Sequence, residues 1–139
     1  MGRCHNSTVI DAPVDQIRAK LRDFHGLSWS PLIESCTPIG KLRGDQIGVR
    51  RNLNGVFEET LHTLNDAEHS LEYSIDRGPG PMAEGMSDCR GRVHLLPVTE
   101  GNRTFVEWSS AWTGNDKPVA EFCDPIYKGL LADLRKSAE

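Results

Sequence analysis

Apolar and polar residues alternate in three segments of the chain, and this alternation restricts the possible folds more than any other feature of the sequence. The segments are Ser70–Asp76, Cys89–Leu95 and Val106–Thr113. Successive side chains of a β-strand point to opposite faces, so a period of two residues predicts strands with one buried and one solvated face. Strands of this kind are typical of antiparallel sheets. Turn-forming residues between the segments fit consecutive antiparallel strands.

Near the start of the chain, the spacing of apolar residues is helical. After a short predicted strand (His5–Ile10), Asp11 is a suitable N-cap for a helix. The apolar stripe of this helix comprises Val14, Ile17, Leu21 and Phe24. A second short helix is expected around Ser30–Glu34, because Pro31 suits the first turn of a helix.

The longest helical pattern closes the chain. Its apolar residues keep helical spacing over about four turns, and they are Val119, Phe122, Cys123, Ile126, Tyr127, Leu130, Leu131 and Leu134. Pro125 has no backbone N–H, so a kink or break is expected near Asp124. The order of strand, two short helices, several strands and one long helix predicts an α+β fold. In such a fold the long helix can cover the inner face of a curved sheet.

Length and composition predict one soluble domain spanning residues 1–139. Hydrophobic residues make up 37% of the 139 residues and charged residues 26%. The formal net charge of −4 argues against nucleic acid as a partner, since its binders carry basic stripes. No apolar run reaches the length of a membrane span, and no signal-peptide core is visible. The four cysteines are scattered, which favours reduced thiols and a cytoplasmic location.

Asn54-Gly55 is the strongest hairpin signal, because a type I′ turn requires positive φ at both central residues. A two-residue loop at this point places Arg50 opposite Glu59, on the same face as Phe57 and Leu61. A charged pair on an apolar face is a candidate for function. The alternative is a solvated ion pair near the open end of the sheet, worth less than about 1 kcal/mol.

Several motifs together resemble one known family. The stretch D-A-P-V-D-Q-I…D-F-H-G-L…W-S-P-L-I runs from Asp11 to Ile33. Later motifs are an arginine-bearing strand, Glu59-x-Leu61, a tyrosine-bearing strand (Tyr73), a strand ending in Pro97 and a tryptophan-bearing strand (Trp108). This pattern resembles the START-like helix-grip (SRPBCC) superfamily, in particular its polyketide cyclase/dehydrase branch. Within that branch it is similar to the plant lachrymatory factor synthase and its bacterial relatives.

The resemblance implies a seven-stranded antiparallel sheet that grips the C-terminal helix, with a ligand cavity between them. The apolar inner faces of the strands agree with such a cavity, although aromatic residues also fill ordinary cores. The candidate ligand-binding residues are Phe57, Leu61, Tyr73, Val93, Trp108, Trp112, Phe122 and Ile126. The Gly78–Pro81 segment is expected at the mouth of the cavity, where a loop can control access.

Glu59 is the candidate general acid or base, and an arginine beside it would stabilise developing negative charge. Hairpin geometry selects Arg50 for this second role. The family's Gly-x-x-Arg spacing, counted from Gly48, selects Arg51 instead, and alternation along the strand also places Arg51 beneath the helix. Both arginines stay candidates, and we favour Arg50.

Three functions fit the sequence. The leading one is binding of a small hydrophobic or aromatic metabolite. The second is cyclisation, dehydration or isomerisation without a cofactor, and the third is a lipid or quinone carrier. No metal is expected, because no two of the five histidines have the spacing of metal ligands. A nucleotide cofactor is not expected either, since no glycine-rich phosphate loop is present. Neither the ligand nor the oligomeric state follows from the sequence.

Overall fold

The computed structural model describes residues 1–139. It contains seven strands, two α-helices and one short 3-10 helix. The helices are α1 (Val14–Leu21), η1 (Gly80–Met82, the 3-10 helix) and α2 (Asp116–Ala138). The strands are β1 (Gly2–Ile10), β2 (Cys36–Ile39), β3 (Arg50–Leu53), β4 (Phe57–Asn65), β5 (Ser70–Arg77), β6 (Ser87–Val98) and β7 (Arg103–Thr113).

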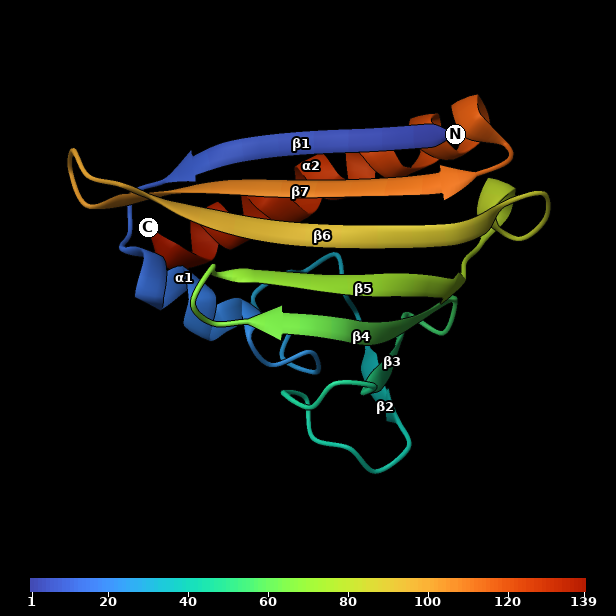
Figure 1. Ribbon diagram of the computed structural model, residues 1–139, viewed down its shortest axis with the longest axis horizontal. Coiled ribbons are helices and arrows are strands. Elements are labelled where there is room, and N and C mark those ends of the chain that lie inside the picture. Colours follow the sequence, from blue (N-terminus) through green and yellow to red (C-terminus); the bar gives the residue numbers. More distant parts are fainter.

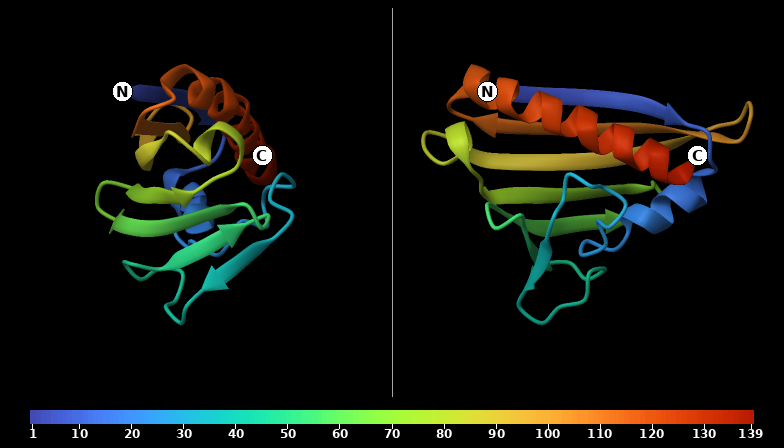
Figure 2. Two further views of the ribbon diagram at one scale, coloured as in Figure 1. Left: turned by 90° about the vertical axis from the view of Figure 1, so that its right-hand side faces the viewer. Right: turned by 180° about the vertical axis from the view of Figure 1, so that it is seen from behind.

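All seven strands form one antiparallel sheet in the order β1-β7-β6-β5-β4-β3-β2. The first strand therefore pairs with the last, and the remaining strands follow as a meander. Figure 1 views the sheet from its outer face, with α2 behind it. In Figure 2, the view from behind shows α2 crossing the inner face of the sheet diagonally, with α1 at the C-terminal end of α2. This is the α+β architecture that the sequence predicts.

The core lies between the inner face of the sheet and α2. It contains the inward-facing residues of the three alternating segments, with Tyr73, Val106 and Trp112 among the most deeply buried. From α2, the core includes Val119, Cys123, Tyr127, Leu130, Leu131 and Leu134. Alternation in the strands and helical spacing in α2 thus identified the buried faces correctly.

The second short helix, expected around Ser30–Glu34, does not form. These residues make turns, and the side chain of Asn54 binds their backbone groups. The Asn54 carbonyl oxygen accepts hydrogen bonds from the N–H groups of Glu34 and Ser35, at 2.7 and 3.1 Å. Its amide nitrogen donates to Leu32 O at 2.9 Å. The prediction of a helix was wrong because the side chain of Asn54, which is distant in the sequence, binds backbone groups that would otherwise pair within the helix.

Of the kink or break predicted near Asp124, the break is absent, since α2 is helical from Asp116 to Ala138. Pro125 lies on the exposed side of α2. Water can therefore satisfy the carbonyl group that loses its donor, and the buried side of the helix keeps its hydrogen bonds.

The Asn54-Gly55 turn forms as predicted, but the strand register differs from the prediction. Both central residues have positive φ, 56° and 75°, and Val56 N–H donates to Leu53 O at 3.0 Å. Val56 is not paired in the sheet, however, because Leu53 lies opposite Phe57. This one extra residue shifts every later pair by one position.

Candidate functional site

Arg51 of β3 and Glu59 of β4 form a buried ion pair beneath α2. The register places the two residues directly opposite each other. Arg51 Nε donates to Glu59 Oε1 at 2.8 Å, and Arg51 Nη2 lies 2.7 Å from the same oxygen. The side chains are only 7% and 6% exposed. The expectation that Arg50 faces Glu59 is therefore wrong, and Arg51 is the partner.

Arg50 points to the other face of the sheet. It lies opposite Thr60, its side chain is 41% exposed, and its nearest acidic atom is Glu58 Oε2 at 3.8 Å. The unpaired Val56 shifts the register of the strands by one residue, and such a shift moves a side chain to the opposite face of the sheet. Arg51 therefore faces Glu59 in place of Arg50.

A second set of contacts fixes the guanidinium group of Arg51. Its Nη1 donates to Phe24 O at 2.9 Å, and its Cζ lies 3.7 Å from the centre of the Phe24 ring. The Tyr73 ring is also near, with its centre 5.7 Å from Cζ. Hydrogen bonding to two groups and stacking on an aromatic face hold the guanidinium group rigidly. Several of the guanidinium N–H groups are therefore already bound to protein atoms.

The Glu59 carboxylate has fewer hydrogen-bond partners within the protein than the Arg51 guanidinium group. Its Oε1 accepts from Arg51, whereas no hydrogen bond in the structure reaches Oε2. Glu59 lines the cavity described below, and one of its two carboxylate oxygens has no hydrogen bond within the protein.

Three aromatic residues form a polar chain beside this pair. Trp108 Nε1 donates to the hydroxyl oxygen of Tyr73 at 2.8 Å, and the Tyr73 and Tyr127 hydroxyl groups lie 3.4 Å apart. Burial raises the pKa of both tyrosines, and the nearby Glu59 carboxylate raises that of Tyr73 further. Both phenols are therefore neutral hydrogen-bonding groups at physiological pH.

Gly91 of β6 makes room for this chain. It lies opposite Tyr73, and a Cβ atom at this position would be 2.2 Å from Tyr73 Cζ. The absence of a side chain lets the tyrosine ring lie across β6 toward Trp108.

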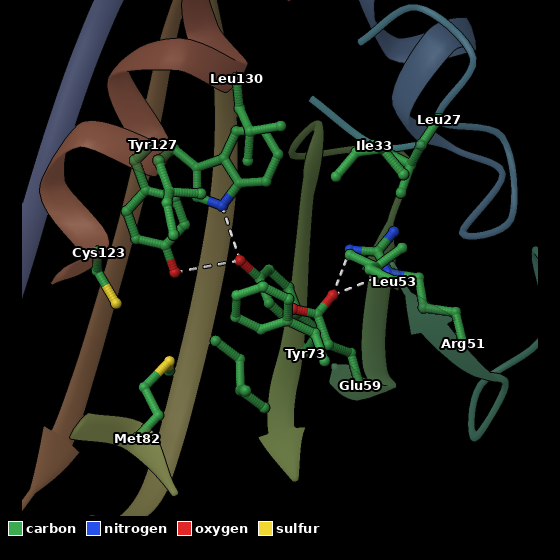
Figure 3. A pocket seen from close by; sticks show the side chains of 14 residues that line it. Leu27, Ile33, Arg51, Leu53, Glu59, Tyr73, Met82, Cys123, Tyr127 and Leu130 are labelled. Atoms are coloured by element: carbon green, nitrogen blue, oxygen red, sulfur yellow. Dashed lines mark hydrogen bonds and ion pairs between the residues drawn. The ribbon is translucent and has the colours of Figure 1, made fainter. Parts of the chain in front are cut away.

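The ion pair and the aromatic chain border a cavity between the sheet and α2 (Figure 3). Its volume is 50 Å³, and 12 of its 14 lining residues are hydrophobic. The lining comprises Leu27, Ile33, Arg51, Leu53, Phe57, Glu59, Tyr73, Ile75, Met82, Trp108, Cys123, Ile126, Tyr127 and Leu130. A volume of this size has room for about three or four water molecules, whereas pockets for drug-sized ligands measure about 300–1,000 Å³.

Four of the eight predicted ligand-binding residues line this cavity, namely Phe57, Tyr73, Trp108 and Ile126. The other four do not. Leu61, Val93 and Trp112 are buried in the surrounding core. Phe122 packs beside η1, where a Cβ on Gly80 would lie 3.6 Å from its ring.

Sequence reasoning missed eight lining residues, namely Leu27, Ile33, Leu53, Ile75, Met82, Cys123, Tyr127 and Leu130. Cys123 and Tyr127 belong to the apolar stripe of α2, but the stripe is wider than the cavity. Leu27 and Ile33 reach the cavity through a segment of irregular structure, for which periodicity gives no signal. Met82, on η1, follows the Gly78–Pro81 segment directly and lines the cavity, whereas no residue of Gly78–Pro81 does, so the placement of that segment at the mouth stays a prediction.

No group of three or more His, Cys, Asp or Glu side chains is placed to hold a metal ion. No helix is long and apolar enough to cross a membrane.

Comparison with known proteins agrees with this architecture. The sequence model of the family described as polyketide cyclase/dehydrase and lipid transport matches residues 1–139. The chain belongs to this family. The description of the family names cyclisation, dehydration and lipid transport, and it assigns no particular ligand or reaction to this chain. The closer resemblance to lachrymatory factor synthase stays a prediction.

Solved structures support the family assignment. A protein from Nitrosospira multiformis is 40% identical, with a TM-score of 0.95 over 99% of this chain and 96% of its own. The protein XoxI from Bacillus cereus is 25% identical, with a TM-score of 0.83 over 99% and 96% of the two chains. A START superfamily protein from Mycobacterium smegmatis shares the fold at 15% identity, with a TM-score of 0.75 over 99% and 97%. The predicted helix-grip fold is thereby confirmed. No curated protein matches the sequence.

Proposed function

We propose that this protein binds a small hydrophobic or aromatic molecule between the sheet and α2. The observation that carries this proposal is an apolar cavity with a single buried ion pair in its wall. Sites for small molecules combine an apolar lining with a few fixed polar groups, and here those groups are Glu59, Arg51 and the two tyrosine hydroxyls. A buried ion pair is weak evidence for stability, so its presence needs another reason.

Binding requires the cavity to widen, because 50 Å³ is too small for a metabolite with a ring. Three of its lining residues, Ile33, Phe57 and Ile126, are only half-buried and therefore form its mouth. Met82 lies on the short helix η1, which consists of one turn. Rotation of these side chains and a shift of η1 would enlarge the cavity without disturbing the sheet.

Solvent extraction of the purified protein, followed by mass spectrometry, tests for a co-purified ligand. A panel of hydrophobic and aromatic compounds is then titrated against tryptophan fluorescence, since Trp108 forms part of the wall. We expect a saturable change for at least one compound class. Ile126→Trp should fill the mouth and weaken binding, whereas Ala132→Trp, on the exposed side of α2, should not. Equal binding by both variants, or no binding by any compound, would contradict the proposal.

A second candidate is proton-transfer catalysis of the cyclase, dehydrase or isomerase kind, with Glu59 as acid or base. The free Oε2 atom favours it, because a general base must reach the proton that it removes. Arg51 would act mainly by holding the carboxylate in place, since its own donors are directed at Glu59 and Phe24.

The test uses any compound from the panel that the protein converts. Glu59→Gln should abolish turnover and leave binding largely intact, because the amide keeps the shape of the carboxyl group and cannot accept a proton. Arg50→Gln, on the opposite face, is the control and should keep full activity. Undiminished turnover by Glu59→Gln would remove Glu59 from the mechanism.

A further inference from the structure

The outer face of the sheet carries a group of arginines that the proposed function does not use. Ala111 of β7 lies opposite Arg3 of β1 on one side and opposite Arg90 of β6 on the other. Directly paired residues point to the same face of a sheet, and neighbouring strands lie about 4.8 Å apart. The Cα atoms of the two arginines are therefore about 10 Å apart. Both side chains can reach a point above Ala111, near the end of β1 marked N in Figure 1.

Neither Arg3 nor Arg90 has an acidic partner, since no ion pair or side-chain hydrogen bond in the structure involves them. Glu107, an acidic residue of the same face, is bound elsewhere. Glu107 contacts His5 and His94, at 3.0 and 3.3 Å.

Two other acidic residues of the sheet are likewise bound to other groups, whereas Asp88, two residues before Arg90 on β6, is exposed, has no ion pair and does not line the hollow described below. Glu72 pairs with Arg92 at 3.5 Å, and Asp76 accepts hydrogen bonds from Thr60 and Ser74. Two like charges on either side of one small residue repel each other, which disfavours this arrangement in the free protein.

The arginines border a hollow in the surface. Its lining includes Arg3, Arg90 and Arg92, together with the small residues Ser109 and Ala111. Because the side chains of Ser109 and Ala111 on β7 are short, the surface is recessed between the longer arginine side chains of β1 and β6. The wall contains one acidic residue, Glu72, which is paired with Arg92. This local excess of positive charge occurs in a chain whose formal net charge is −4, so it does not reflect a basic composition.

We propose that this hollow binds a phosphate-type anion through Arg3 and Arg90. The planar guanidinium group matches phosphate oxygens in a bidentate geometry, and two such groups can approach one anion from opposite sides. An anion here would also remove the repulsion between the two arginines. The phosphate group can belong to a soluble phosphorylated compound or to the headgroup of an anionic lipid.

Titration of the isotope-labelled protein with pyrophosphate, followed by NMR, tests this site. We expect saturable shifts of the Ser109 and Ala111 amide signals at low ionic strength, weakening as salt is added. Arg3→Gln and Arg90→Gln should each weaken binding about threefold, and the double variant about tenfold. Arg43→Gln is the matched control, because Arg43 is 78% exposed and lies on the distant β2–β3 loop.

Sedimentation with lipid vesicles separates the two sources of phosphate. Binding to anionic but not neutral vesicles, lost in the double variant, would assign the hollow to a lipid headgroup. Binding of pyrophosphate alone would assign it to a soluble phosphorylated compound.

Either result requires that the variants keep the wild-type circular dichroism spectrum. The proposal is overturned if neither probe binds. Equal weakening by Arg43→Gln would also overturn it, because the effect would then be that of an adventitious ion only. Failure here leaves the proposal for the inner cavity untouched, since the two sites lie on opposite faces of the sheet.

Discussion

Replacing Arg51 by methionine should destabilise the protein strongly. The substitution keeps much of the side-chain volume but leaves the Glu59 carboxylate, 6% exposed, without its partner at 2.7 Å. It also removes the donor to Phe24 O. Removing one partner of a buried ion pair costs about 3–5 kcal/mol. A domain whose unfolding free energy is about 10 kcal/mol, in the middle of the usual range, would stay folded at room temperature. Its Tm should fall by about 10–20 °C.

The double variant Arg51→Met/Glu59→Leu should recover most of this loss. Replacement of a whole buried pair by apolar residues is neutral or stabilising by about 1–4 kcal/mol, because no charge is left unpaired. Arg50→Met is the matched control on the same strand. Its side chain is 41% exposed and its ion pair spans 3.8 Å, so its removal should cost less than about 1 kcal/mol.

Urea unfolding followed by tryptophan fluorescence gives the unfolding free energies of the wild type, Arg51→Met, the double variant and the Arg50→Met control. Trp108 and Trp112 lie in the core and report its opening. A cost below about 1 kcal/mol for Arg51→Met would refute the reasoning, because it would show that water solvates the pair. A double variant as unstable as Arg51→Met would mean that the pair is needed for the fold itself. The argument for a functional role would then lose its basis.

Three further predictions rest on other contacts. Gly91→Ala should destabilise the fold by about 1–3 kcal/mol in urea unfolding, because the new Cβ would lie 2.2 Å from Tyr73 Cζ. An unchanged urea midpoint would contradict the close contact between Gly91 and the Tyr73 ring. Hydrogen bonding and the charge of Arg22 lower the pKa of Asp66, so the ionised carboxylate stabilises the fold above about pH 4 and this contribution disappears in acid. The stability difference between wild type and Arg22→Gln should therefore be present at neutral pH and vanish as the pH falls through the lowered pKa of Asp66, and a difference that persists in stronger acid would exclude this ion pair as its cause. Burial raises the pKa of Cys89 to about 12, so a thiol reagent should not modify it in the folded protein at mild pH; rapid modification would show that β6 opens.

Much of the architecture followed from short-range patterns. A period of two residues located β5, β6 and β7 and the buried face of each, because a strand alternates its side chains whatever its neighbours are. Tyr73 and Trp108 were placed inward for this reason, and both line the cavity. Glu59 was likewise placed inward as a candidate by its position among apolar residues, and it is buried.

Other features depend on contacts between distant parts of the chain. Val56, which is left unpaired after the Asn54-Gly55 turn, exchanges the faces of Arg50 and Arg51. The sequence offers no local sign of this extra residue, because the turn has the same residues with or without it. The sequence analysis also missed the cavity-lining residues of the irregular segments and of η1, because these segments show no periodic spacing of apolar residues.

The sequence by itself determined the order of elements, the inner faces of the long strands and the presence of a carboxylate on one of them. Only the tertiary structure decided which arginine pairs with Glu59 and how small the closed cavity is. It also brought two unpaired arginines to either side of Ala111. The physical reason is the same in each case. Periodicity determines the face toward which a side chain points, whereas strand register and long-range packing determine which residues it contacts.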